Sequence, residues 1–169
     1  MIILGIDPAI RCTGYSVIEV KNVSSIRILD CGVIKNKPKD LHSECLRRLS
    51  GGINELVHHF SPDYASLEEA FYGKNIKTSM VLSLARGAII ARLAEHGVSC
   101  YQYSPKTAKK SITGSGRGSK EQIATLIASI YNLNINDVPL DATDAIALGI
   151  CHANFYFSLG PENLTEYLI

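Results

Sequence analysis

The sequence contains no apolar run near the ~20 residues that a membrane-spanning helix needs. Its first residues lack the basic segment of a secretory signal, and a charged residue, Asp7, comes too early for one. The five cysteines are scattered and form no C-x-x-C pair, which argues against a disulfide framework and against a zinc site. These absences predict a cytoplasmic protein with reduced thiols and no membrane partner.

No repeat, low-complexity tract or obvious linker divides the chain. Its 169 residues are enough for one well-buried domain and too few for two of ordinary size. Hydrophobic residues make up 46% and charged residues 20%, as in folded globular proteins rather than in disordered ones. We therefore expect a single domain over residues 1–169, with its core in about residues 1–156 and a peripheral tail at 157–169.

Basic residues are missing from the last part of the chain, where residues 121–169 hold 6 acids and no Lys or Arg. Residues 71–120 instead hold 9 basic side chains and one acid, and residues 1–70 are nearly neutral, with 8 basic and 9 acidic side chains. A basic segment beside an acidic one suggests a polyanion-binding surface next to a cation-binding site. The alternative is that these charges only solvate the outer faces of helices.

Hydrophobic patterning predicts five strands, with helices between and after them. The expected strands cover about residues 2–7, 13–20, 25–35, 64–68 and 98–103. The expected helices cover about residues 41–60, 77–95, 120–131 and 141–156, with a short helical turn at 105–110 and a flexible loop at 113–119. We expect the first three strands to form an antiparallel meander within a mixed five-stranded sheet flanked by helices. This α/β order is that of the ribonuclease H-like fold, and a fold alone does not fix a function.

Four acids stand where predicted elements end or begin. Asp7 ends the first strand, Glu68 ends the fourth, and Asp141 and Asp144 open the last helix, where their spacing places both on one face. Hard divalent cations such as Mg²⁺ bind carboxylate oxygens, and carboxylates that converge without a cation repel one another. Two such ions can stabilise both the attacking and the leaving oxygen of a phosphoryl displacement.

Each acid also has a structural explanation. Asp141 follows Pro139-Leu140 and fits a helix N-cap, and Asp7 stands before Pro8 and fits a turn. Glu69 rivals Glu68, because strand alternation only places the two side chains on opposite faces. Single acids are therefore weak signals, and their combination is the informative one.

Four segments resemble signature segments of the bacterial RuvC-type Holliday junction resolvases, and the likeness runs from Met1 to about Phe155. They are Ile3-Leu4-Gly5-Ile6-Asp7-Pro8, Leu67-Glu68-Glu69-Ala70-Phe71, Ala85-Arg86-Gly87 and Asp141-Ala142-Thr143-Asp144-Ala145. The resemblance implies a homodimeric endodeoxyribonuclease that resolves four-way junction DNA by paired symmetric nicks in recombination and repair, and that leaves a 5′-phosphate and a 3′-hydroxyl. It also implies cooperation with a branch-migration helicase complex.

Carried over position by position, the resemblance implies that four acids bind two Mg²⁺ ions per subunit. Mn²⁺ is expected to substitute for Mg²⁺. These acids are Asp7, Glu68, Asp141 and Asp144, with Glu68 rather than Glu69 as the ligand. The family usually has a glycine just after the Asp-Pro pair, and Ala9 stands there in this chain. An alanine is strained if that backbone position needs a positive φ.

Lys109 and Lys120 resemble family lysines that lie at the active site and engage the cleaved backbone. Other basic residues near the Gly-rich loop, which lacks the spacing of a nucleotide-binding P-loop, are candidates for contacts with DNA phosphates. These are Lys74, Lys106, Lys110 and Arg117. The alternative for each lysine or arginine is a solvated surface charge.

Phe71 matches the family's aromatic residue that stacks on a base near the crossover, and packing in the core is the alternative. In the family, the helix corresponding to 77–95 contributes to the dimer interface. Its small residues would equally suit burial against the protein's own sheet. His152 follows the acidic pair on the last predicted helix, and we expect it to pack rather than to act at the site.

Three other functions compete with the resolvase. Gly5-Ile6-Asp7 followed by Gly14 resembles the phosphate hairpin of actin-like and sugar-kinase-like phosphotransferases, but the chain is too short for their second domain. A nuclease of the same fold that acts on RNA is a nearer rival. The third is a junction-binding protein that has lost catalysis, against which the four acids weigh.

Overall fold

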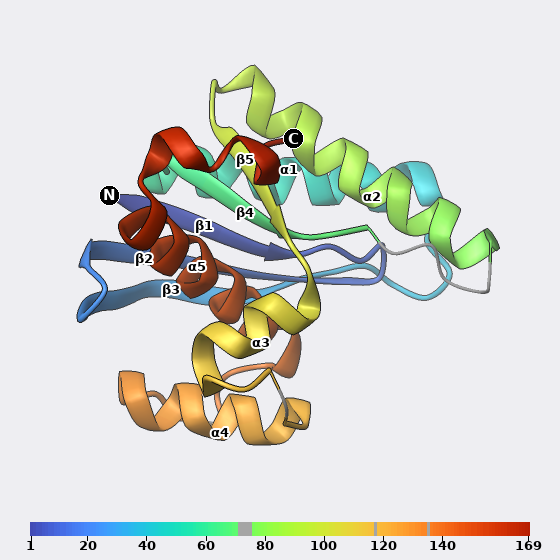
Figure 1. The fold of residues 1–169 in the computed structure, drawn as a ribbon. Coiled ribbons are helices and arrows are strands. Elements are labelled where there is room, and N and C mark those ends of the chain that lie inside the picture. Colours follow the sequence, from blue (N-terminus) through green and yellow to red (C-terminus); the bar gives the residue numbers. More distant parts are fainter. Residues whose placement is uncertain (71–75, 117, 135) are drawn as a thin grey trace.

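A computed structural model describes residues 1–70, 76–116, 118–134 and 136–169 of the chain (Figure 1). The strands are β1 (Ile2–Asp7), β2 (Cys12–Asn22), β3 (Ser25–Lys35), β4 (Tyr64–Glu68) and β5 (Ser99–Tyr103). The helices are α1 (His42–Phe60), α2 (Ile76–Glu95), α3 (Pro105–Thr113), α4 (Lys120–Tyr131) and α5 (Leu140–Leu159), followed by two 3₁₀ helices, η1 (Pro161–Asn163) and η2 (Thr165–Tyr167). None of the helices described is long and apolar enough to cross a membrane.

The five strands form one sheet in the order β3-β2-β1-β4-β5. The first three strands pair antiparallel, whereas β4 pairs parallel with both β1 and β5. The predicted meander and mixed sheet are therefore confirmed. In register, Ile6 of β1 lies beside Leu67 of β4, so the carboxyl ends of these two strands meet at one edge of the sheet.

Helices cover both faces of the sheet (Figure 1). Successive residues of a strand point to opposite faces, and in β1 Ile3 joins one core cluster while Leu4 joins the other. The Leu4 cluster packs the sheet against α1 and α2, and the Ile3 cluster packs it against α5, with α3 and α4 outside. Two apolar layers of this kind hold the strand ends and the start of α5 in fixed positions.

Two helices extend beyond their predicted ends. The expected turn at 105–110 is a helix that continues to Thr113, and the Ser104 side chain caps its start by accepting a hydrogen bond from the Thr107 amide. Gly114 then ends it in the left-handed conformation, with φ 75°. The last helix continues past residue 156 to Leu159.

The tail that the sequence marks as peripheral packs back against β5. Leu164 is fully buried, the Tyr167 ring stacks on Tyr103 with 5.1 Å between centroids, and the Ile169 amide donates to the Cys100 carbonyl at 2.9 Å. The final residues thereby cover the outer edge of the sheet.

Candidate metal and nucleic-acid site

The site lies where α5 crosses directly over the sheet. A Cβ on Gly14 would stand 1.9 Å from the Asp141 carbonyl oxygen, and a Cβ on Gly5 would stand 2.1 Å from the Ala145 carbonyl oxygen. Only glycine allows so close an approach of helix and strand. Gly14 also pairs with Asp7 across β1 and β2, so this contact places Asp141 next to Asp7. The sequence shows both glycines, but no local pattern in it indicates that they pack against α5.

Three of the four predicted acids converge. Asp7, Asp141 and Asp144 each offer one carboxylate oxygen, and these oxygens lie within 4.8 Å of one another. The N-cap of α5 is Pro139, so the interpretation of Asp141 as the cap residue is wrong. Asp141 and Asp144 lie inside α5, where a spacing of three residues turns both toward the end of β1.

Glu68 lies beside this trio, although outside the group of oxygens within 4.8 Å. It ends β4 next to β1, and its charge raises the pKa of Asp7, while the charge of Asp144 raises the pKa of Glu68. Glu69 is exposed. The geometry therefore brings Glu68 rather than Glu69 to the other acids.

Electrostatic strain marks the cluster as a cation site. Burial, followed by the charges of Glu68 and Asp144, raises the pKa of Asp7 from 3.8 to about 7. Burial and Asp144 likewise raise the pKa of Glu68. A divalent cation would relieve this repulsion, and a set of carboxylate oxygens fits a hard cation such as Mg²⁺.

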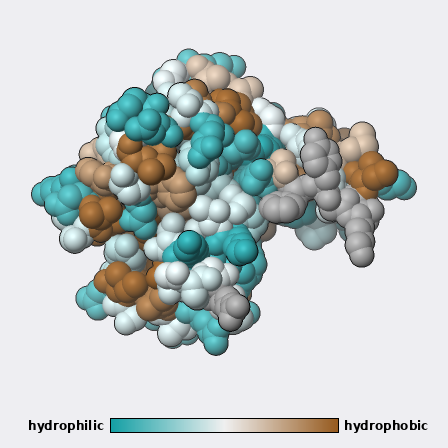
Figure 2. Space-filling view, in the orientation of Figure 1, coloured by the Kyte–Doolittle hydropathy of each residue, from teal (hydrophilic) through white to brown (hydrophobic). Residues whose placement is uncertain are grey.

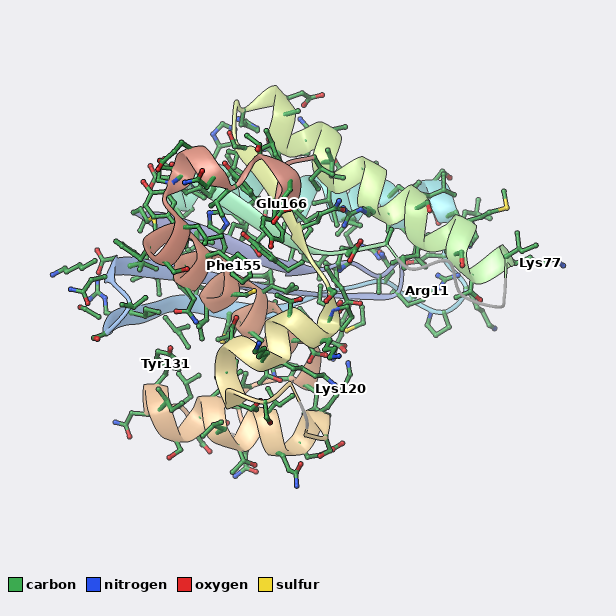
Figure 3. The ribbon with its side chains drawn as sticks, viewed as in Figure 1. Arg11, Lys77, Lys120, Tyr131, Phe155 and Glu166 are labelled. Atoms are coloured by element: carbon green, nitrogen blue, oxygen red, sulfur yellow. The ribbon has the colours of Figure 1, made fainter. Side chains whose placement is uncertain are left out.

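Two predicted lysines reach the acids from α3 and α4. Lys120, labelled in Figure 3 at the start of α4, donates from Nζ to a carboxylate oxygen of Asp144. That hydrogen bond raises the pKa of Lys120. Lys109 lies on α3, and its charge opposes the rise in the Glu68 pKa. The site thus combines carboxylates with ammonium groups able to contact a phosphate.

The other predicted DNA contacts are only partly described. Lys106 and Lys110 are exposed on α3. A Cβ on Gly116 would stand 3.2 Å from the Lys106 carbonyl oxygen, so the Gly-rich loop folds back onto this helix. The predictions for Phe71, Lys74 and Arg117 fall outside the described residues.

The alanine that replaces the family glycine after the Asp-Pro pair causes no backbone strain. Ala9 is absent from the described residues with positive φ. Its amide donates to Thr13 Oγ1 at 3.2 Å, and Thr13 Oγ1 donates to the Ala9 carbonyl at 2.5 Å. The turn after Asp7 is therefore braced by a buried threonine and accommodates alanine.

His152 packs away from the acids, as the sequence predicted. It is fully buried, and its Nδ1 lies 2.9 Å from the Tyr103 hydroxyl. Burial lowers the pKa of His152 from 6.5 to about 4, so the ring is neutral at physiological pH. Its role is to link α5 to β5.

One residue near the site received no role from the sequence. Arg86 of α2 donates to the Glu68 carbonyl and to Gln102 Oε1, the latter at 2.7 Å. It stands in the family-like segment Ala85-Arg86-Gly87, but neither that resemblance nor the helical pattern assigned it a function.

Comparisons with known proteins give one consistent family. The family model described as "Crossover junction endodeoxyribonuclease RuvC" matches residues 3–152. Relatives of that name occur in Chlorobium phaeovibrioides, 36% identical over 89% of this chain and 80% of the relative, and in Caldicellulosiruptor saccharolyticus, 38% identical over 90% and 92%.

A solved structure agrees with these relatives. Thermus thermophilus RuvC in complex with a Holliday junction substrate matches with a TM-score of 0.87 and 29% identity, over 95% of this chain and 97% of that one. This likeness confirms the ribonuclease H-like fold predicted from the order of strands and helices. Because the family model spans most of the chain and relatives above 30% identity align along nearly all of it, the chain belongs to the RuvC family of crossover junction endodeoxyribonucleases.

Proposed function

We propose that the chain is a structure-selective endodeoxyribonuclease that resolves Holliday junctions during DNA recombination and repair. The observation that carries the proposal is the convergence of Asp7, Asp141 and Asp144, with Glu68 beside them and Lys120 paired to Asp144. The relative from Thermus thermophilus was solved with a Holliday junction substrate, which supports the substrate class. A single nuclease domain over the whole chain fits this function.

The metal ligands in this proposal are the four acids, Asp7, Glu68, Asp141 and Asp144. They would hold two Mg²⁺ ions per subunit, with Mn²⁺ as a substitute. Bound divalent cations supply charge stabilisation to the attacking and leaving oxygens of phosphodiester hydrolysis. The raised pKa values of Asp7 and Glu68 support this assignment, because ionised carboxylates at such a spacing need a nearby positive charge.

The lysines supply the remaining positive charge. Lys120 pairs with Asp144, is half exposed, and has a flexible stem that lets it exchange this carboxylate for a DNA phosphate. Lys109 approaches Glu68 from α3, and exposed Lys106 and Lys110 extend the basic surface. We expect hydrolysis of each phosphodiester to leave a 5′-phosphate and a 3′-hydroxyl at the nick, with one nick made by each subunit. Phe71, Lys74 and Arg117 remain proposed DNA contacts by family resemblance.

A homodimer is the proposed assembly, and the outer face of α2 supports it. Ile76, Met80 and Leu84 are 74%, 64% and 51% exposed, and Figure 2 shows apolar surface at the start of this helix. Gly87 and Ala91 are small, exposed residues farther along the same helix. A two-fold dimer would place two matched sites on a junction that itself has approximate two-fold symmetry.

Cooperation with a branch-migration helicase is proposed by family resemblance. The DNA substrate and five free thiols fit a cytoplasmic location.

The test is cleavage of a labelled synthetic four-way junction, against matched linear DNA and a matched RNA duplex, with Mg²⁺ or EDTA. We expect paired nicks confined to the junction with the wild type and Mg²⁺, and none with EDTA or with Asp7→Asn. Asp63→Asn is the matched control, because Asp63 stands just before β4, at the other end of that strand from Glu68, and its carboxylate accepts a hydrogen bond from the Ile2 amide. Tight junction binding without cutting in Mg²⁺ or Mn²⁺ would contradict the proposal, as would preferred cutting of RNA.

A further inference from the structure

Arg86 is unusual among the buried side chains. It is 7% exposed, and among the described residues it is the one buried side chain with a permanent charge. Burial lowers its pKa, and no ion pair formed among the described residues involves it. A buried guanidinium without a paired carboxylate costs stability unless its donors are satisfied, so packing alone gives no reason for it.

The partners of Arg86 are neutral oxygens at the end of the strand that carries Glu68. Its guanidinium donates to the Glu68 carbonyl and, at 2.7 Å, to Gln102 Oε1 on the neighbouring strand β5. Pro8, the residue after Asp7, lines the same small cavity as Arg86 and Glu68. One side chain from α2 therefore reaches the ends of β4 and β5 beside the turn that follows Asp7.

These contacts fix one peptide unit from both sides. The carbonyl of Glu68 accepts from Arg86, and the amide of the same peptide unit, on Glu69, donates to the Tyr103 carbonyl at 2.9 Å. With both polar groups held, that peptide plane cannot rotate. Because this peptide plane fixes the backbone direction from Glu68 to Glu69, it keeps the Glu68 side chain toward the acids and the Glu69 side chain toward solvent.

We propose that Arg86 is a positioning residue for the metal site, which holds the Glu68 carboxylate in place through its hydrogen bond to the Glu68 backbone. The inference rests on the proposed function, because it assumes that Glu68 binds the metal. Partners that orient metal ligands in this way typically contribute ~10–100-fold to metal affinity.

The experiment measures Mn²⁺ binding by calorimetry on the full-length protein without DNA, so that it does not depend on cleavage. Arg86→Met should weaken Mn²⁺ binding ~10–100-fold, and Arg86→Lys should recover part of this, because one ammonium cannot span both acceptors. Gln102→Leu leaves Arg86 in place and should have a smaller effect. The matched control is Arg92→Met on the same helix, whose partners Ser50 and Glu95 lie away from the site.

The thermal midpoint of each variant is measured in parallel, and Arg86→Lys serves if Arg86→Met does not fold. Equal Mn²⁺ affinity in the wild type and both Arg86 variants would overturn the inference, even if those variants are less stable. A wild-type protein that binds no Mn²⁺ would instead overturn the proposed metal site. The two failures are therefore distinguishable.

Discussion

Glu68 and Glu69 show how the fold turns one of two neighbouring acids toward the proposed metal site. Glu68 is the last residue of β4 and Glu69 follows it, and strand alternation turns neighbouring side chains to opposite faces. The fixed peptide unit between them, held by Arg86 and Tyr103, directs Glu68 toward Asp7 and Asp144. Glu69 is left in solvent.

Replacing Glu68 and Glu69 separately should give clearly different cleavage rates. Glu68→Gln removes a proposed metal ligand, so junction cleavage in saturating Mg²⁺ should fall by more than about 100-fold, because even the partners of metal ligands contribute ~10–100-fold. Glu69→Gln removes an equal charge one residue away and should leave cleavage within about two-fold of the wild type. Initial cleavage rates on a labelled junction test the pair, and equal losses would refute the assignment of Glu68.

His152 predicts a pH dependence of stability that is separate from catalysis. Its folded pKa of about 4 lies below the unfolded value of 6.5, so the unfolded chain binds more protons between these limits. The resulting stability is fully present above pH 6.5 and is lost as the pH falls toward 4, by about 3 kcal/mol on the scale of 1.36 kcal/mol per pKa unit.

Urea unfolding at pH 7 and at pH 4.5 measures this effect. His152→Gln should lower the free energy of unfolding at pH 7 and flatten its dependence on pH over this range. His96→Gln, at a partly exposed histidine that contacts Asn54, is the control and should keep the wild-type slope. A wild-type slope in His152→Gln would show that other groups carry the effect.

At the scale of elements, the contact of α5 with the sheet decides whether the acids meet. The Asp141 carbonyl oxygen lies 1.9 Å from where a Cβ of Gly14 would stand, and the Ala145 carbonyl oxygen lies 2.1 Å from where a Cβ of Gly5 would stand. Any side chain at either glycine must push α5 away from β1 and β2. Because Asp141 and Asp144 are carried by α5, that shift would open the group of carboxylates.

Gly14→Ala should therefore lose metal binding as well as stability. Overpacking of this kind costs typically ~1–3 kcal/mol, and the displaced α5 should reduce cleavage further than the loss of folded protein explains. Gly51→Ala is the matched control, because a Cβ there meets nothing within 4 Å and should stabilise α1 by about 0.5–1 kcal/mol. The free energy of unfolding and the Mn²⁺ affinity are measured together. Unchanged Mn²⁺ affinity in folded Gly14→Ala would contradict the role of the close contact.

Periodicity predicted the strands and helices well because each face of the sheet is buried by its own apolar set. It missed the end of α3, which is set by Gly114 in the left-handed conformation. It also missed Arg86 and the packing of Gly14, because a contact between distant segments leaves no local pattern. Family resemblance supplied the choice of Glu68 over Glu69, which strand alternation left open.

At the scale of the whole molecule, two matched cuts require two sites in a fixed relation. The exposed residues Ile76, Met80 and Leu84 line the outer face of α2, while the inner face of the same helix carries Arg86 toward Glu68. In a dimer formed through this face, one helix of each subunit would connect the interface to the metal site, so the two metal sites would have a fixed relative position. Dimerisation and cleavage are therefore expected to depend on the same helix.

Leu84→Glu should separate these subunits, because it places a charge on the proposed apolar interface. We expect sedimentation to show a dimer for the wild type and a monomer for Leu84→Glu at the same protein concentration. The control is Ile130→Glu, at a residue that is 55% exposed on α4 and outside the proposed interface. A Leu84→Glu protein that remains dimeric would move the interface elsewhere.

Cleavage of a supercoiled plasmid that extrudes a cruciform tests the central claim of paired junction resolution most directly. Two symmetric cuts within one complex convert the plasmid to a linear product, whereas independent single cuts release nicked circles. We predict linear product with wild-type protein and Mg²⁺, cut at opposed positions of the junction, and none with Asp7→Asn. Nicked circles alone at every protein concentration, or equal cutting of a plasmid without the cruciform, would contradict the account.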